Sequence, residues 1–235
     1  MVSHGLLPGR LRIDIFFPIK KTATVPIVLC LIIAAAAFSG CARKHVRDIN
    51  KLERTVEAIR KNNRNACTPG CIAFDGDSNM EIINFQEYLT EPACNYALRG
   101  STTEEVLKRK EMLHSLNPDA IIVLVGGNDI IKGTTPGDIS RNYLMLIRYY
   151  RTFCKKVYFI SNLPVDPNIY IKNSDMMRLN ERLRQICKNL GATYVNVYPH
   201  LLKDGGLNPD YAIDPVHLNK AGQNVLVDIL KKYLQ

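Results

Sequence analysis

The sequence predicts an α/β fold: a doubly wound sheet of five parallel strands with helices on both faces. Short apolar runs alternate with amphipathic segments five times between residue 71 and the C-terminus, and such alternation is typical of parallel sheets. The run at 120–125 is apolar throughout, as expected of a strand that is buried on both faces. The length of 235 residues, with 46% hydrophobic and 23% charged residues, suits a globular protein with one well-buried core.

The predicted elements follow one another without an internal repeat or a second domain. Strands are expected at 71–75, 94–98, 120–125, 157–160 and 193–197, and helices at 79–89, 101–116, 136–154, 174–190 and 218–234. Ser101 and Glu104 have the spacing of a capping box, and Pro136 occupies a first helical position. Ser174 is expected to cap the fourth helix, and Gly191 to end it.

Residues 1–40 are predicted to be an export signal. Basic residues precede an apolar run at 26–38, which is shorter than the roughly 20 residues that a membrane-spanning helix needs. The run ends in Phe38-Ser-Gly-Cys41, which resembles the bacterial lipoprotein cleavage box. That resemblance implies cleavage before Cys41, lipid attachment to its sulfur and an anchor in the bacterial envelope, on the periplasmic or cell-surface face. An uncleaved signal anchor or a secreted protein without lipid is the alternative.

Residues 41–66 are predicted to form a basic helical stalk, followed by a folded domain at 67–235. Apolar residues recur in the stalk at helical spacing, and eight Lys and Arg residues lie between 43 and 64. These charges would attract anionic lipid head groups, or would simply solvate the stalk. Ala42, and not Asp, follows Cys41; the resemblance to lipoproteins then implies the outer membrane, if the host is Gram-negative. The net charge of +9 accompanies no nucleic-acid recognition motif, so we expect no nucleic-acid partner.

Five of the seven cysteines lie in the predicted folded domain: Cys67, Cys71, Cys94, Cys154 and Cys187. Export would place them in an oxidising compartment, where disulfides persist. The expected strand and helix order predicts a Cys154–Cys187 bond and one bond among Cys67, Cys71 and Cys94. The Cys67/Cys71 spacing lacks the second pair that a zinc site requires, so no metal or other cofactor is expected.

Candidate catalytic residues follow the predicted strands. Ser78 follows the first strand in Gly76-Asp77-Ser78, Asn128 follows the third, and Asp214-Pro-Val-His217 follows the fifth after a loop. The carboxyl ends of parallel strands meet at one edge of the sheet, where ligands bind in such folds. A hydroxyl, an imidazole base, a carboxylate that orients the base and amide donors are the groups that nucleophilic acyl transfer needs.

These motifs resemble the GDSL (SGNH) hydrolase family of esterases and lipases over about residues 70–235. The resemblance implies a flavodoxin-like fold, with Ser78 as the nucleophile, His217 as the base and Asp214 as the acid that orients it. It also implies that Ser78, Gly100 and Asn128 form the oxyanion hole. Two departures border the expected site: Asn79 stands where the founding pattern has Leu, and Pro215 where many members have Gly.

Each motif also has a purely structural explanation. Ser78 could cap a helix, Asn128 could form a turn, and His217 could be a surface residue. Asp77 and Asp129 are expected to bind loop backbone, and Asp75 is not expected to reach His217.

The sequence therefore favours a serine esterase acting on an acyl ester, with a short chain and a carbohydrate or lipid alcohol, in an oligomeric state that it does not specify. An acyltransferase on the same scaffold and a non-catalytic envelope lipoprotein that binds glycan or lipid are the alternatives. The chain lacks the Gly-x-Gly-x-x-Gly and Walker motifs of nucleotide-binding domains.

Overall fold

The computed structural model describes Glu57 and residues 67–234. The predicted export signal at 1–40, the lipidation site Cys41 and the predicted stalk at 41–66 lie outside these described residues, except for Glu57 in a helical conformation.

Five parallel strands form the central sheet, as predicted. They are β1 (Ile72–Gly76), β2 (Ala93–Asn95), β3 (Ala120–Leu124), β4 (Lys156–Ile160) and β5 (Thr193–Val195). Their order, β2-β1-β3-β4-β5, is that of a flavodoxin-like sheet, in which the chain changes winding direction beside β1. In register, Phe74 of β1 lies between Asn95 of β2 and Ile122 of β3. The carboxyl ends of β1, β2 and β3 therefore lie side by side.

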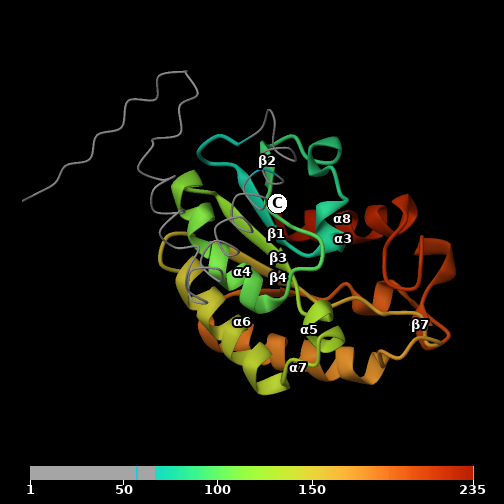
Figure 1. Cartoon of the computed structure of the whole chain (residues 1–235). Coiled ribbons are helices and arrows are strands. Elements are labelled where there is room, and N and C mark those ends of the chain that lie inside the picture. Colours follow the sequence, from blue (N-terminus) through green and yellow to red (C-terminus); the bar gives the residue numbers. More distant parts are fainter. Residues whose placement is uncertain (1–56, 58–66, 235) are drawn as a thin grey trace, which may run out of the picture. The chain divides into compact units, whose positions relative to one another are not determined.

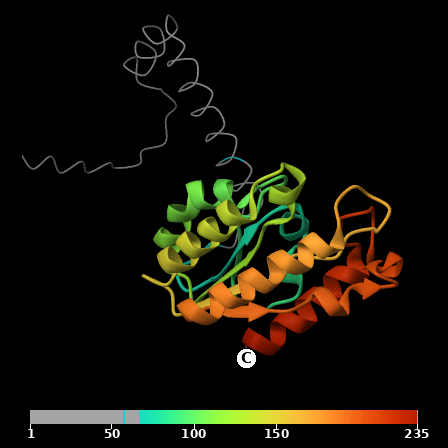
Figure 2. The same cartoon turned by 90° about the horizontal axis from the view of Figure 1, so that it is seen from below.

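Alternate residues of each strand face two different hydrophobic layers, because successive side chains of a strand point to opposite faces. One layer joins Phe74 and Ile122 to helix α8 (Lys220–Leu234) and to the short helix α3 (Ser78–Glu81). The other joins Ala73 and Ile121 to helices α4 (Thr103–Arg109), α6 (Pro136–Tyr150) and α7 (Asn173–Leu190). Figures 1 and 2 show these helices covering the two faces of the sheet.

Two of the predicted helices are shorter than expected. The helix expected at 79–89 ends after one turn as α3, and a 3₁₀ turn follows at Phe85–Glu87. The Asn95 amide donates to the carbonyls of Met80 and Ile83 at 2.8 and 3.2 Å, which satisfies the carbonyl groups at the helix end. The capping box expected at Ser101 and Glu104 lies one residue later, at Thr102 and Glu105, so α4 begins at Thr103. After Arg109 the chain continues as a 3₁₀ helix, Lys110–Leu116.

The remaining helices agree with the sequence prediction more closely. Thr135 caps α6, with Pro136 at its start. Helix α7 begins at Asn173 without a side-chain cap, so the predicted capping by Ser174 is wrong, and it ends as predicted at Gly191 in the left-handed conformation (φ 69°). The sequence did not predict α5 (Gly127–Ile131).

Several short elements connect β5 to α8. They comprise a 3₁₀ turn at Tyr198–His200, a hairpin of β6 (Leu202–Lys203) and β7 (Gly206–Leu207), and a 3₁₀ turn at Pro209–Tyr211. An antiparallel bridge between Ala212 and Leu218 then closes a tight loop. Asp214 and His217 lie within this loop, whose ends the bridge holds together.

The disulfide prediction is partly wrong. Cys67 and Cys94 form the one bond expected among Cys67, Cys71 and Cys94, with Cα atoms 5.2 Å apart. Cys71, Cys154 and Cys187 are buried free thiols, so the predicted Cys154–Cys187 bond is absent. The Cys154 sulfur instead lies 3.5 Å from the carbonyl of Lys156, at the start of β4. Burial raises the pKa of Cys187 to about 12 and that of Cys71 to about 11, so both thiols are poor nucleophiles.

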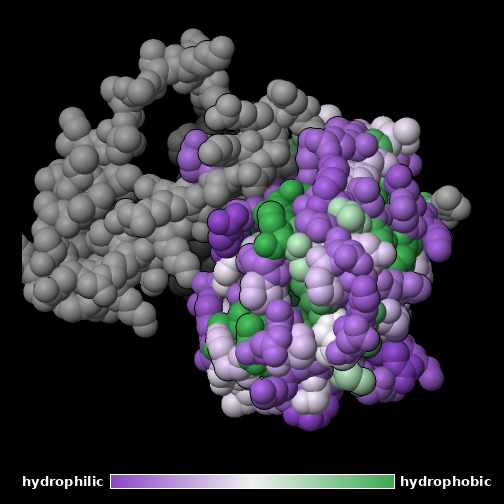
Figure 3. Space-filling model, turned by 90° about the vertical axis from the view of Figure 1, so that its right-hand side faces the viewer, coloured by the Kyte–Doolittle hydropathy of each residue, from purple (hydrophilic) through white to green (hydrophobic). Residues whose placement is uncertain are grey.

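On the molecular face in Figure 3, hydrophobic residues form small, separate patches on a mainly hydrophilic surface. Within the described part of the chain, no helix combines the length and hydrophobicity that crossing a membrane would require.

Candidate active site

Ser78 lies just beyond the carboxyl end of β1. Gly76 ends this strand with φ +147°, and a Cβ there would lie 2.1 Å from the carbonyl oxygen of Leu124. Only glycine therefore allows β1 to approach β3 so closely at this point. The Asp77 carboxylate then accepts the N–H of Asn79 at 3.0 Å and caps α3. Ser78 becomes the first residue of that helix and is 7% exposed.

Ser78, His217 and Asp214 come together although 139 residues separate the serine from the histidine. The Ser78 Oγ lies 2.8 Å from His217 Nε2, and His217 Nδ1 lies 2.7 Å from Asp214 Oδ2. Asp214 Oδ1 also accepts the backbone N–H groups of Val216 and His217, at 2.9 and 2.8 Å. Partial burial raises the pKa of Asp214, but these hydrogen bonds and the His217 ring outweigh that effect and lower it. The carboxylate is therefore ionised at neutral pH, where it orients the imidazole.

Asn79 connects the two halves of this arrangement. Its side-chain amide donates to the carbonyl of Val216 at 3.0 Å, and its Oδ1 accepts the N–H of Leu218 at 3.1 Å. The two hydrogen bonds hold the backbone on either side of His217. The sequence marked Asn79 only as a departure from a family pattern, and no local signal pointed to this contact.

The three expected oxyanion-hole residues lie around one cavity. Ser78, Gly100, Asn128 and His217 all line a cavity of about 230 Å³. Gly100 has φ +73°, a conformation that favours glycine. The Asn128 side-chain amide donates to the carbonyl of Ser101 at 3.1 Å, which places it beside Gly100. Asp214 does not line the cavity, because it lies behind the His217 ring.

The nearby aspartates have structural contacts, as predicted. Asp129 accepts hydrogen bonds from the backbone N–H and the hydroxyl of Thr103, at 2.8 and 2.7 Å. Asp75 pairs with the buried guanidinium of Arg109. Burial raises the pKa of Asp77 to about 7, against the effect of its hydrogen bond from Asn79.

The rest of the cavity wall is mainly apolar. The segment after β4 was expected to shape the pocket, and Asn162, Leu163 and Val165 do line it. Ile131 and Met176 also line the cavity, although the sequence gave no indication that they would. Among residues 67–234, no group of three His, Cys, Asp or Glu side chains is arranged to hold a metal ion.

A doubly wound sheet with a hydrogen-bonded serine, histidine and aspartate beyond its carboxyl edge carries the groups that acyl-transfer chemistry requires. The chain belongs to the GDSL-like lipase/acylhydrolase family, whose model matches residues 82–225. The matched region includes Gly100, Asn128, Asp214 and His217 and begins just after Ser78.

Solved structures of this kind share the fold. A GDSL-like lipase from Bacteroides thetaiotaomicron is 21% identical with a TM-score of 0.66, and the match covers 76% of this chain and 95% of that protein. An acetylxylan esterase from Geobacillus stearothermophilus is 16% identical with a TM-score of 0.60, covering 71% and 94%.

A curated relative matches over a shorter part of its length. It is an N-acylneuraminate cytidylyltransferase of Streptococcus agalactiae, 24% identical over 151 residues, which are 64% of this chain and 35% of the relative. This chain therefore matches well under two thirds of that protein.

Proposed function

We propose that the protein is a serine esterase in which Ser78 attacks the acyl group. The observation that carries this proposal is the continuous hydrogen-bonded chain from Ser78 Oγ through His217 to Asp214, with links of 2.8 and 2.7 Å. Two structures of the acetylxylan esterase are catalytic mutants in which a serine or a histidine is replaced by alanine. That esterase therefore uses the same two residue types, which supports the assignment.

The reaction follows from the order of these contacts. His217 Nε2 takes the Ser78 hydroxyl proton while Oγ bonds to the carbonyl carbon, and Asp214 stabilises the imidazolium. The tetrahedral intermediate then breaks its bond to the alcohol oxygen, which takes the proton from His217. Water attacks the acyl-serine with His217 again as the base, and this step releases the carboxylic acid and restores Ser78.

The oxyanion would be stabilised by the N–H groups of Ser78 and Gly100 and by the amide of Asn128. All three residues line the cavity, and donors that are in position before the reaction would need little reorganisation during it.

The cavity supports a short acyl chain. Its volume of about 230 Å³ is below the roughly 300–1,000 Å³ of sites for drug-sized ligands. The apolar side chains of Leu163, Ile171 and Met176 suit a small alkyl group. An acetyl ester of a carbohydrate is the substrate that best fits a cavity of this size. Two similar proteins, an acetylxylan esterase and an N-acylneuraminate cytidylyltransferase, are also named for acylated sugars.

We also propose that the enzyme is exported and lipid-anchored through Cys41. Palmitate labelling in cells tests the anchor: the wild-type chain should incorporate label and Cys41→Ser should not. Equal labelling of the two chains would contradict it.

The central test is hydrolysis of p-nitrophenyl esters by the purified chain beside Ser78→Ala. Acetate should be hydrolysed faster than long-chain esters, and Ser78→Ala should lower kcat by at least about 10³-fold. Full activity in folded Ser78→Ala would refute the serine mechanism. A folded wild type that does not turn over ester, but transfers acetyl to an added alcohol, would identify an acyltransferase.

A further inference from the structure

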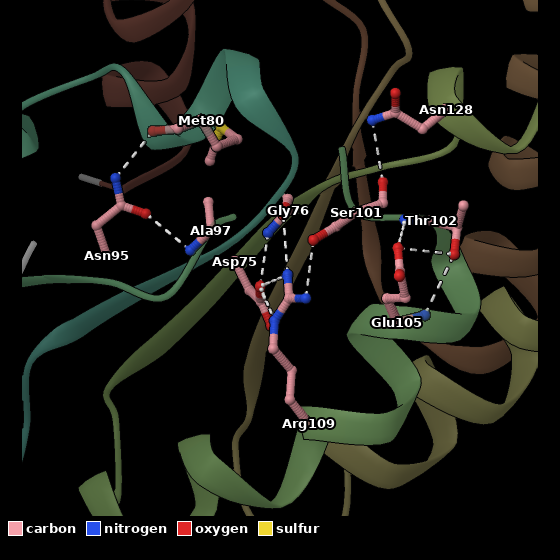
Figure 4. A network of polar contacts seen from close by, with 10 residues as sticks. All are labelled: Asp75, Gly76, Met80, Asn95, Ala97, Ser101, Thr102, Glu105, Arg109 and Asn128. Atoms are coloured by element: carbon pink, nitrogen blue, oxygen red, sulfur yellow. Dashed lines mark hydrogen bonds and ion pairs between the residues drawn. The ribbon is translucent and has the colours of Figure 1, made fainter. Parts of the chain in front are cut away.

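Arg109 makes contacts that the proposed reaction does not explain. It is the last residue of α4, is 6% exposed and does not line the cavity. Its Nε and Nη2 donate to Asp75 Oδ1 at 3.1 and 2.6 Å. Nη2 also donates to the carbonyl of Gly76 at 2.9 Å, and Nη1 to the hydroxyl of Ser101 at 2.9 Å. Figure 4 shows the guanidinium between the end of β1 and the Ser101 loop.

The two segments that Arg109 joins lead directly to the expected oxyanion donors. Gly76 lies two residues before Ser78, and Ser101 follows Gly100. The carbonyl of Ser101 in turn accepts the amide of Asn128 at 3.1 Å. One guanidinium therefore sets the separation of the segments that carry the Ser78 and Gly100 N–H groups, and through Ser101 it also reaches Asn128.

Stability alone is a weak explanation for this buried pair. Asp75 is 1% exposed, and its Oδ2 has no hydrogen-bond partner. Burial raises the pKa of Asp75, and the Arg109 guanidinium acts against that rise. A buried ion pair often contributes no more to stability than apolar residues of similar volume. An apolar replacement would lack the planar guanidinium, whose N–H groups bind Asp75, Gly76 and Ser101 at the same time.

We infer that Arg109 is a positioning residue for the oxyanion hole, acting through Gly76 and Ser101 on the Ser78, Gly100 and Asn128 donors. The inference rests on the proposed esterase reaction. A displacement of catalytic groups by about 1 Å can lower the rate by about 10²-fold. Since the oxyanion forms only during the reaction, loss of positioning lowers kcat and leaves KM nearly unchanged.

The test compares Arg109→Lys and Ser101→Ala with the wild type in p-nitrophenyl acetate hydrolysis. Ser101→Ala removes one side-chain hydrogen bond and keeps the carbonyl that accepts from Asn128, so it is expected to fold. We expect kcat to fall about tenfold in Ser101→Ala and about 10²-fold in Arg109→Lys, with KM within about twofold of the wild type. Leu183→Ala is the control, because Leu183 is fully buried in the core beneath α7 and does not line the cavity.

A purely structural role predicts that kcat changes only with the fraction of folded protein. The control should lower the melting temperature while kcat per folded molecule stays near the wild-type value. Unchanged kcat in folded Ser101→Ala, or a loss of kcat in Leu183→Ala equal to that in Ser101→Ala, would overturn the inference. Ser78→Ala in the same assay separates the two failures: full activity there refutes the esterase mechanism itself, whereas its inactivity beside a fully active Ser101→Ala refutes only the role of Arg109.

Discussion

The two halves of the proposed active site are built differently. The oxyanion half lies at the ends of β1, β2 and β3, where Asp75, Arg109 and Asp129 are buried and bonded across elements far apart in sequence. The acid–base half is a loop after the sheet, where the side chains of His217 and Asp214 are 28% and 44% exposed. Three hydrogen bonds within this loop are local, between Asp214 and its neighbours Val216 and His217. From outside the loop, the N–H of Asp166 donates to the carbonyl of Pro215 at 2.8 Å.

The contrast shows where the catalytic geometry comes from. The half with the expected oxyanion donors depends on the packing of the sheet and on buried hydrogen bonds between its elements. The half with His217 and Asp214 depends on one tight loop, on the contact of Asn79 with Val216 and Leu218, and on the Asp166 N–H that donates to the Pro215 carbonyl. Loops held by few buried contacts open at a lower free energy than core strands do. We therefore expect substitutions in the two halves to have different signatures.

The largest expected effect is a loss of kcat that is greater for replacement of His217 than for replacement of Asp214. His217→Ala removes the base and should lower kcat by about 10⁴-fold or more. Asp214→Ala should lower kcat by roughly 10–100-fold less than His217→Ala does, since water can reach this exposed site and accept the imidazole N–H. Steady-state kinetics on p-nitrophenyl acetate measures both, and equal losses would show that Asp214 is as indispensable as the base.

A smaller effect is expected at Asn79, the link between the two halves. Asn79→Leu leaves the carbonyl of Val216 and the N–H of Leu218 without their partner, and unfolding should become easier by about 1–3 kcal/mol. Because the backbone on both sides of His217 is released, kcat should fall about tenfold.

Asn95→Leu is the matched control for Asn79, since Asn95 is also buried and bonds the backbone of Met80, Ile83 and Ala97. We expect a comparable loss of stability and a smaller loss of kcat. If Asn95→Leu lowered kcat as much as Asn79→Leu at equal stability, the specific link to His217 would be wrong.

The smallest expected effect concerns pH and the buried half. Burial raises the pKa of Asp77 to about 7, from 3.8, whereas the pKa of Asp214 is lowered in the exposed half. The ionised form of Asp77 is thus disfavoured in the folded protein. The protonated side chain contributes its full stability near pH 4, and this contribution is lost as the pH rises to about 7. Asp77→Asn keeps the cap on α3 and should be more stable than the wild type by about 1–2 kcal/mol at pH 8. Urea unfolding at pH 4.5 and pH 8 checks this, and a difference that does not change with pH would contradict it.

The sequence predicted the elements whose signals are local. The apolar run before Gly76 and the apolar run at 120–125 gave β1 and β3 nearly to the residue. The helix expected at 79–89 failed because its end depends on Asn95, whose amide meets Met80 and Ile83 only after β2 has joined the sheet. The Cys154–Cys187 prediction failed in a similar way, since a plausible order of helices does not specify which side chains face each other.

By itself, the sequence determined the strand–helix alternation and the placement of Ser78, Gly100, Asn128 and His217 after strands. Alternation and strand ends are set by residues a few positions apart, so they can be recognised along the chain. Only the tertiary structure decided that Asn79 binds the loop around His217, and that Arg109 joins Asp75, Gly76 and Ser101. Asn79 and Leu218 lie 139 residues apart in the sequence, and Arg109 and Asp75 lie 34 residues apart. Packing of the tertiary structure buries these polar groups, and each buried group then requires a hydrogen-bond partner. Such contacts between distant residues therefore cannot be recognised along the chain.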